Sequence, residues 1–257
     1  MIFSIERKAA WKGGLSSFII NLFHNVKIYQ GKFINPYLCP MQNKLIDLTH
    51  LLNENISVYP DTIAPEFEVM NTVEKDGFAE VKVTMVLHSG THIDAPCHIL
   101  QNTKSLDEFT LDKFIGNAIL IPCRDRKEID LEYLKTYQSV ISQIDFILFF
   151  TGWQYKWKTK EYFDDCPTLT DDAARWLTQF NLKGIGFDSF SVDNIDSADK
   201  VSPSTLPNHH ILLAKEILLI ENLCNLDMLP DGIFTFQCLP IKVENADGSP
   251  VRAIAMI

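Results

Sequence analysis

The sequence predicts an α/β or α+β protein that folds as one compact domain. From Leu45 to the C-terminus, short apolar runs typical of buried strands alternate with stretches of helical periodicity. No internal repeat or low-complexity linker interrupts this alternation. With 257 residues, of which 46% are hydrophobic, the chain is large enough to bury a substantial core.

The first element is a strand expected over residues 81–88. Valine, methionine and leucine at the odd positions alternate with mostly polar residues at the even positions, which is the two-residue period of a half-buried strand. This strand would lead directly into the histidine-rich segment that follows it.

Later apolar runs, bounded by glycine, proline or charged residues, are expected to form short buried strands. These runs are 118–122, 145–150, 184–188, 217–222 and 232–240. Residues 168–180 predict a helix, with Thr170 as the N-cap, aspartates in the first turn and apolar side chains on one face. Residues 208–216 predict a short helix before the strand that begins at 217.

Composition and charge exclude several classes of protein. Six cysteines are scattered without a C-x-x-C pair, which argues against a disulfide framework and favours a cytoplasmic protein. The net charge of −10, with no basic run among aromatic residues, argues against nucleic acid as a partner. No stretch approaches the ~20 consecutive apolar residues of a membrane span, so no membrane partner is expected.

Residues 1–40 are expected to form an N-terminal extension to a domain over residues 41–257. Basic residues precede the apolar run LSSFIINLF in the manner of a secretory signal, but polar residues dilute this run and no small-x-small cleavage site follows it. An amphipathic extension or an upstream start is the simpler interpretation.

Residues 88–98, HSGTHIDAPCH, gather three of the seven histidines around Asp94. This cluster indicates a metal site, a general acid/base site, both together, or an exposed patch without function. A helical H-E-x-x-H site is excluded, because Pro96 alone would cost a helix about 3 kcal/mol. A fully extended segment is excluded too, since it would separate His88 from His92 by ~13 Å.

The chain is therefore expected to turn at Ser89-Gly90, where glycine accepts backbone angles that other residues avoid. His92 and Asp94 would then lie on one side of the segment. Together with His88 they form an N/O ligand set that suits Zn²⁺, Mn²⁺ or Fe²⁺ and leaves coordination positions open for water. Open positions are typical of a catalytic site.

His98 lies on the same side and is either a further ligand or a neutral imidazole beside the metal. We favour the second interpretation, because a hydrolytic site needs a proton carrier whose pKa lies near the working pH. Cys97 would point the other way and is expected to be a buried bystander rather than a nucleophile.

The segment contains all seven fixed positions of H-x-G-T-H-x-D-x-P-x-H, and so resembles the metal-dependent cyclase-like hydrolase family of bacterial kynurenine formamidases and isatin hydrolases. The similarity continues to the C-terminus through IDLTH, ISVYP, TGW, GFDSFSVD, HHILL and ENL, and excludes residues 1–40. It implies a compact α/β domain around a barrel-like mixed sheet with flanking helices.

The resemblance also implies a site for two metal ions, expected to be Zn²⁺, with one ion or Mn²⁺ as alternatives. The ligands that it implies are His88, His92, Asp94, His209 and Glu221. Asp94 would bridge the two ions, and His210 is the alternative to His209. Glu221 interrupts an apolar strand, where either a metal or a salt bridge to lysine or arginine would offset the burial of its charge.

In the same family, His98 corresponds to the general acid/base. Tyr59 corresponds to an aromatic residue that contacts the substrate, commonly a tryptophan in kynurenine formamidases. The aromatic residues of 149–157 are expected to wall a pocket for an aromatic substrate, or else to belong to the core or to a subunit interface.

The predicted function is metal-dependent hydrolysis of a small aromatic amide. An aryl formamide such as N-formylkynurenine, which gives kynurenine and formate in tryptophan catabolism, is the leading substrate. The alternatives are a hydrolase of isatin or of another cyclic amide or lactone, and a metal-binding protein without turnover. Because members of the family form dimers or tetramers, a homodimer or homotetramer is expected.

Overall fold

The computed structural model describes residues 27–29, 32–34, 44–193 and 206–257. The chain divides into two compact units, Met1–Asn43 and Lys44–Ile257. In the first unit, β1 (Lys27–Tyr29) pairs antiparallel with β2 (Lys32–Ile34). The division into an extension over 1–40 and a hydrolase domain stays a prediction, and the apolar run LSSFIINLF lies outside the described residues.

A nine-stranded mixed sheet forms the framework of the second unit, in the order β14-β6-β12-β11-β9-β7-β13-β15-β3. The four strands from β12 to β7 run parallel, and the others join antiparallel. The strands are β3 (Leu45–Asp47), β6 (His92–Asp94), β7 (Ile115–Pro122), β9 (Phe146–Phe150), β11 (Gly184–Phe187), β12 (Leu218–Glu221), β13 (Phe234–Gln237), β14 (Gly248–Pro250) and β15 (Ile254–Met256).

The main sheet is curled. Thr49, just beyond the edge strand β3, forms an antiparallel bridge with Leu223, just beyond β12 near the opposite edge. The amide of Cys224 donates a hydrogen bond to the carbonyl of Leu48 at 3.0 Å, which is a usual length for a backbone hydrogen bond between strands. The prediction of an α/β domain around a barrel-like mixed sheet is confirmed.

Apolar side chains cover both faces of the central strands. Along β9, Phe146, Leu148 and Phe150 enter one core cluster, and Ile147 and Phe149 enter another. Burial on both faces explains why these strands read as continuous apolar runs rather than as alternating patterns. All five predicted runs overlap a strand of the main sheet, although β7 begins three residues before its predicted run.

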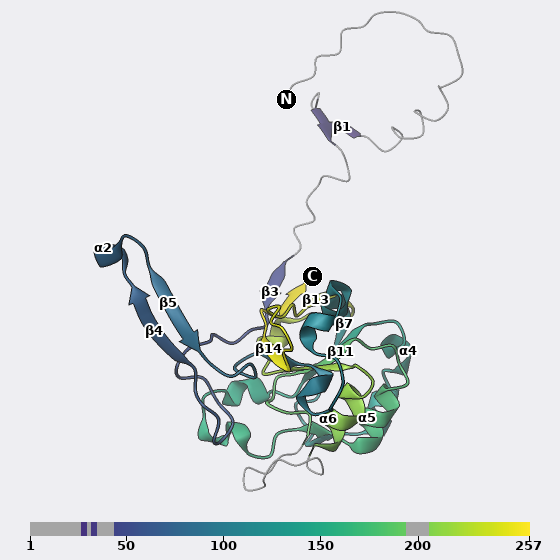
Figure 1. Ribbon diagram of the computed structural model, residues 1–257. Helices are drawn as coiled ribbons and strands as arrows, with labels where there is room; N and C mark the ends of the chain where they lie inside the picture. The colour runs from purple at the N-terminus through teal and green to yellow at the C-terminus, as the bar shows by residue number, and fades with distance from the viewer. Residues whose placement is uncertain (1–26, 30–31, 35–43, 194–205) are drawn as a thin grey trace, which may run out of the picture. The chain divides into compact units, whose positions relative to one another are not determined.

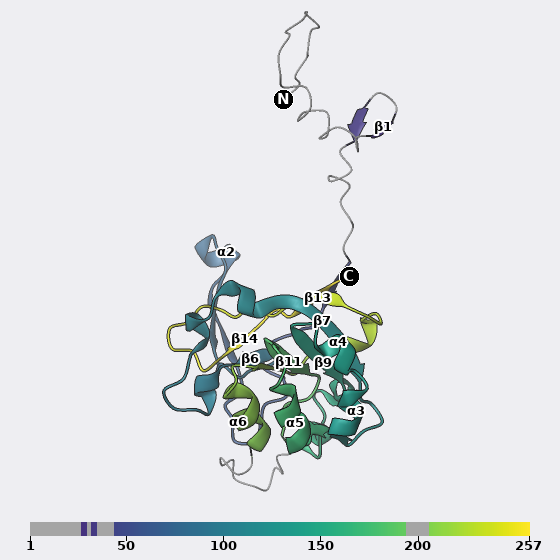
Figure 2. The same ribbon diagram turned by 90° about the vertical axis from the view of Figure 1, so that its right-hand side faces the viewer.

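Helices flank one side of the sheet, as Figure 2 shows. They are α3 (Leu131–Lys135), α4 (Gln138–Ile141), α5 (Asp171–Leu177) and α6 (Pro207–Leu213). Both predicted helices are therefore present. Thr170 is the N-cap of α5, although its hydroxyl donates to Asp172 instead of capping a backbone amide. Proline at the start of α6 suits a first turn, where the amide proton has no partner in the helix.

Shorter elements connect the larger ones. Two short strands, β8 (Glu128–Ile129) and β10 (Thr168–Leu169), pair in parallel outside the main sheet. The 3-10 helices are η2 (Pro96–His98), η3 (Leu106–Glu108), η4 (Leu111–Phe114), η5 (Trp153–Lys156), η6 (Lys160–Phe163) and η7 (Leu226–Met228). Within the described residues, no helix combines the length and apolar character needed to cross a membrane.

The strand expected over residues 81–88 is shorter than predicted and is not half-buried, so that prediction was wrong in both respects. β5 (Glu80–Thr84) pairs with β4 (Glu66–Asn71) and ends before His88. These strands and α2 (Val73–Asp76) form an arm that extends from the rest of the unit (Figure 1). All five residues of β5 are exposed, because the core of the unit does not cover the arm.

The arm nevertheless has the two-residue period that the sequence predicts. Cross-strand pairs Phe67–Val83 and Val69–Val81 lie on one face. Lys82 lies on the other face, opposite Glu68, and the two side chains form an ion pair at 3.1 Å. The arm therefore has one apolar face and one charged face, and apart from the partly buried Phe67 the side chains of these pairs are exposed in a single chain.

Candidate metal centre

The histidine-rich segment turns at Gly90. This glycine has φ +65°, in the left-handed region that favours glycine, and the turn brings the rings of His88 and His92 to 5.1 Å between centroids. Nδ1 of His92 donates a hydrogen bond to the carbonyl of Gly90 at 2.9 Å. Its Nε2 therefore carries the free lone pair.

Strand β6 presents His92 and Asp94 on one side and Ile93 to the core on the other. In the antiparallel pairing of β6 with β12, Glu221 lies directly opposite His92. Nε2 of His92 is 3.3 Å from Oδ1 of Asp94 and 3.5 Å from Oε2 of Glu221. Strand register thus brings the distant glutamate to the histidine-rich segment.

Helix α6 supplies His209. Its Nε2 lies 3.5 Å from Oε1 of Glu221, and its Nδ1 donates to Oδ2 of Asp193 at 2.6 Å. The neighbouring His210 faces a different surface hollow, which it lines with Arg175. The structure therefore brings His209, rather than His210, to Glu221.

All five residues predicted as metal ligands meet in two overlapping clusters. Within each cluster, the possible ligand atoms lie within 4.8 Å of one another. The clusters are His88, His92 and Asp94, and Asp94, His209 and Glu221. Asp94 belongs to both, which is the arrangement that the family resemblance implies for a bridging carboxylate.

The residues of these clusters fit a divalent cation. Asp94 is 1% exposed and Glu221 is 6% exposed, so two carboxylates lie buried side by side. Oε1 of Glu221 accepts no hydrogen bond from the described residues, and its ion pairs there are with histidines rather than with lysine or arginine. A cation would offset the cost of burying these charges, and the N/O donor set suits Zn²⁺ or Mn²⁺.

Burial and neighbouring charges shift the pKa values of this site. Burial, with Asp94 close by, raises the pKa of Glu221. Burial alone would lower the pKa of His88, but Asp94 and Asp247 together raise it to about 10. Burial lowers the pKa of His98, which leaves its imidazole neutral and able to accept a proton at neutral pH.

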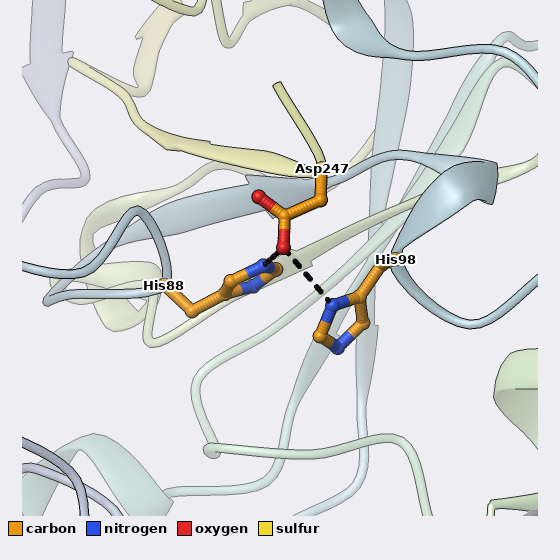
Figure 3. Close-up of side chains that lie close together, drawn as sticks. All are labelled: His88, His98 and Asp247. Atoms are coloured by element: carbon orange, nitrogen blue, oxygen red, sulfur yellow. Dashed lines mark hydrogen bonds and ion pairs between the residues drawn. The ribbon is translucent and has the colours of Figure 1, made fainter. Parts of the chain in front are cut away.

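His98 lies beside these two clusters and joins neither of them, but with His88 and Asp247 it forms a third group whose possible ligand atoms lie within 4.8 Å of one another. It ends the 3-10 helix η2, which Pro96 begins. Its ring lies 4.0 Å from the ring of His88 between centroids, and its Nδ1 is 3.8 Å from Oδ2 of Asp247 (Figure 3). The side chain is 30% exposed, so that the imidazole borders both the buried clusters and an open cavity.

The cavity has a volume of about 640 Å³, which is within the usual range for small-molecule sites. Besides the candidate ligands and His98, its wall includes three aromatic residues, Tyr59, Phe163 and Phe190. Tyr59 and Phe163 contact edge to face at 5.9 Å between ring centroids. The wall is suited to a substrate with an aromatic ring.

The aromatic residues of 149–157 do not line this cavity. Phe149 and Phe150 belong to the core, and Trp157 stacks on His50 at 4.2 Å between centroids. The core alternative therefore holds for these two phenylalanines, whereas Tyr155 is exposed and the alternative of a subunit interface stays a prediction. Cys97 is half-buried against the core, and burial raises the pKa of its thiol, which disfavours a thiolate nucleophile.

Sequence reasoning missed Asp193 and Asp247, which contact the histidines of the site. Asp193 ends the family motif GFDSFSVD, so the motif itself was a signal for this residue. Asp247 lies in ADGSP, far from the histidines along the chain and without the spacing of a metal-binding motif. Only strand pairing brings it to the site.

A curled mixed sheet presents two histidine–carboxylate clusters to an open cavity, which is an arrangement suited to a metal-dependent hydrolase. The chain belongs to the Cyclase family, whose model matches residues 46–194. A kynurenine formamidase from Bacillus anthracis is 32% identical over 213 residues, which cover 82% of this chain and 97% of that protein.

Solved structures agree with this assignment. Isatin hydrolase A from Labrenzia aggregata, bound to benzyl benzoate, is 26% identical with a TM-score of 0.72, over 83% of this chain and 93% of that one. A potential metal-dependent hydrolase with cyclase activity is 24% identical with a TM-score of 0.61, over 83% of this chain and 97% of the other. The second likeness concerns the fold alone.

Proposed function

We propose that this protein is a metal-dependent amide hydrolase that converts an aryl formamide, N-formylkynurenine, to kynurenine and formate. The observation that carries this proposal is the sharing of Asp94 by two clusters of possible metal-binding side chains, beside the imidazole of His98 in an aromatic-walled cavity. Similarity to kynurenine formamidases over most of the chain supports this substrate class.

The roles of the side chains follow from their positions. Two divalent ions, with Zn²⁺ as the expected metal, would be held by His88, His92, Asp94, His209 and Glu221. When bound, such ions lower the pKa of water and polarise an amide carbonyl. Asp193 and the carbonyl of Gly90 fix His209 and His92 in the tautomer that presents Nε2 to the clusters.

His98 is the proposed general base and acid. It accepts a proton from the attacking water and returns it to the nitrogen of the leaving aryl amine, which balances the hydrolysis of the C–N bond. The aromatic wall, with Tyr59 as the proposed contact, holds the aryl ring so that the formyl carbon lies near the clusters. Figure 3 shows the second ring nitrogen of His98 directed away from Asp247, and His98 lines the cavity that would hold the substrate.

The proposed setting is a cytoplasmic homodimer or homotetramer. The scattered cysteines favour a reducing compartment, and the five that the structure describes are free thiols. The uncovered apolar face of the β4–β5 arm supports assembly, because a lone two-stranded hairpin is marginally stable in water.

The test is hydrolysis of N-formylkynurenine by the purified full-length chain after metal analysis. We expect at least one equivalent of divalent metal, turnover with Zn²⁺ or Mn²⁺, and loss of turnover with a chelator. Activity that resists the chelator would contradict metal dependence. Stoichiometric metal without turnover of any amide would indicate a metal-binding protein instead.

A second candidate substrate is a cyclic amide of the isatin type, which the likeness to isatin hydrolase A favours. The same site would open the ring by attack on the lactam carbonyl, with His98 serving both proton transfers. Comparison of kcat/KM for N-formylkynurenine and isatin separates the two candidates. A higher value for isatin would overturn the formamide assignment and leave the hydrolase assignment intact.

A further inference from the structure

The geometry points to Asp247 as a positioning residue that holds both the candidate metal ligand His88 and the candidate base His98. This inference rests on the proposed function for the role of His98, but its effect on metal binding is independent of turnover. Nothing in the motif H-x-G-T-H-x-D-x-P-x-H includes this residue, and its assignment comes from contacts alone.

Backbone pairing fixes the place of Asp247. In the antiparallel pairing of β14 with β6, Gly248 lies opposite Asp94. One residue earlier, the carbonyl of Asp247 accepts a hydrogen bond from the amide of Ala95 at 2.8 Å. The carbonyl of Ala95 in turn accepts from the amide of His98 at 3.0 Å. Backbone hydrogen bonds thus hold Asp247 beside Ala95, which lies between the candidate ligand Asp94 and the candidate base His98.

The side chain of Asp247 faces both imidazoles, as Figure 3 shows. Its Oδ2 is 3.2 Å from Nε2 of His88 and 3.8 Å from Nδ1 of His98. The first distance is that of a hydrogen bond, whereas the second is too long for one and places the carboxylate beside the His98 ring. One carboxylate oxygen therefore faces both rings, bound to the first and in reach of the second if His98 gains a proton.

The other two histidine ligands have equivalent partners. His92 donates Nδ1–H to the carbonyl of Gly90, and His209 donates Nδ1–H to Asp193. Nδ1 of His88 faces Oδ1 of Asp94 at 2.7 Å, so that with a cation in the cluster Nδ1 would be the ligand atom and Nε2–H would be the donor to Asp247. Such outer partners fix the tautomer and orientation of metal-binding imidazoles.

Gly248 leaves room for the ring of His88 to pack against the backbone. A Cβ atom at this position would lie 2.5 Å from Cε1 and 2.7 Å from Nε2 of the His88 ring. The ring therefore packs directly on the backbone of β14 while the preceding residue accepts its hydrogen bond. The pair Asp247-Gly248 holds the imidazole through one contact at its nitrogen and another at its face.

The test is Asp247→Ala, with Asp247→Asn as the conservative variant that keeps an oxygen acceptor. Zn²⁺ affinity is measured by competition with a chelator, and kinetics are measured on N-formylkynurenine. We expect Asp247→Ala to weaken Zn²⁺ binding and to lower kcat by about 10- to 100-fold each, with a smaller change in KM. Asp247→Asn should fall between this variant and the wild type.

The matched control is Asp231→Asn, which removes one exposed carboxylate that does not line the cavity and should change neither quantity. Because the Asp247 side chain is 48% exposed, the melting temperatures of its variants should stay close to that of the wild type. Wild-type Zn²⁺ affinity in Asp247→Ala would overturn the inference, even if no amide were hydrolysed by any variant.

A change in the number of bound ions would also overturn the inference that Asp247 is a positioning residue. Possible ligand atoms of Asp247, His88 and His98 lie within 4.8 Å of one another, which is compatible with direct binding of a cation. If Asp247→Ala bound one ion fewer than the wild type at saturating Zn²⁺, then Asp247 would be a ligand and not a positioning residue.

Discussion

Asp94 is common to both clusters of candidate ligands, whereas His209 belongs to one. This difference predicts unequal effects on metal content. His209→Ala should reduce bound metal from about two ions to about one, while Asp94→Ala should reduce it below one, since both clusters lose a carboxylate. Elemental analysis after dialysis measures both values. His210→Ala is the control, because His210 faces another hollow, and should keep the wild-type content.

Equal metal loss in His209→Ala and Asp94→Ala would contradict a shared carboxylate. It would instead indicate that one ion, held by all five side chains, is the functional state.

His98 should affect turnover and not metal content, because it lies beside the clusters and is not among their predicted ligands. We expect His98→Ala to retain its metal and to lose about 10²- to 10⁴-fold in kcat, which is the usual contribution of a general acid/base. Single-turnover kinetics on the metal-loaded enzyme measure this loss. A variant with near wild-type kcat would remove His98 from the proposed role.

The residues of 88–98 were predictable because a tight turn brings them together within one short segment. Gly90 and Pro96 exclude the regular alternatives, and the remaining geometry places three side chains together. His209 and Glu221 came only from family resemblance. Asp247 is 159 positions from His88, and no local rule relates two residues whose contact depends on the pairing of separate strands.

At the level of elements, the strands of the main sheet were predictable because both faces are buried, which leaves runs of apolar residues. Their order was not, since periodicity carries no information on pairing. The pairing matters most for β6, which lies between β12 and β14. One neighbour brings Glu221 opposite His92, and the other brings Asp247 beside Ala95, which lies between Asp94 and His98.

The segment that follows β3 links two other parts of the unit through His50. The His50 amide donates to the hydroxyl of Thr91 at 2.9 Å, and its ring stacks on Trp157. Burial, with a smaller contribution from Lys158, lowers the pKa of His50 to about 4. Its Nε2 is buried without a hydrogen bond to the described residues, so a charged ring is disfavoured in the folded chain.

Because the pKa of His50 is lower in the folded chain than in the unfolded one, its contribution to stability is present above about pH 6.5. It is lost as the pH falls toward 4. Between pH 7.5 and 5 this loss amounts to about 2 kcal/mol. We expect metal-free His50→Gln to lose that much less stability over this interval than metal-free wild type, as measured by urea unfolding. Identical losses would contradict the assignment.

At the scale of the whole molecule, the β4–β5 arm shows that a two-residue period in the sequence predicts a strand but not its surroundings. Alternation at 81–88 indicates a strand with one apolar face, which is present in β5, but it does not say what covers that face. Within one chain Phe67 is partly buried, but Val69, Val81 and Val83 of the same apolar face are exposed. In the expected homodimer or homotetramer, a second copy of the chain would bury this apolar face, because identical apolar faces can pack against each other symmetrically.

This assignment predicts that charge on the apolar face dissociates the assembly. The double variant Val81→Lys/Val83→Lys should sediment as a monomer where the wild type sediments as a dimer or larger species, because two lysines on that face would be desolvated on association. Lys82→Ala changes the opposite face, loses only an exposed ion pair, and should assemble as the wild type does. Circular dichroism should show both variants folded, because the substituted side chains are exposed in the single chain. Unchanged sedimentation of the double variant would place the subunit contact elsewhere on the molecule.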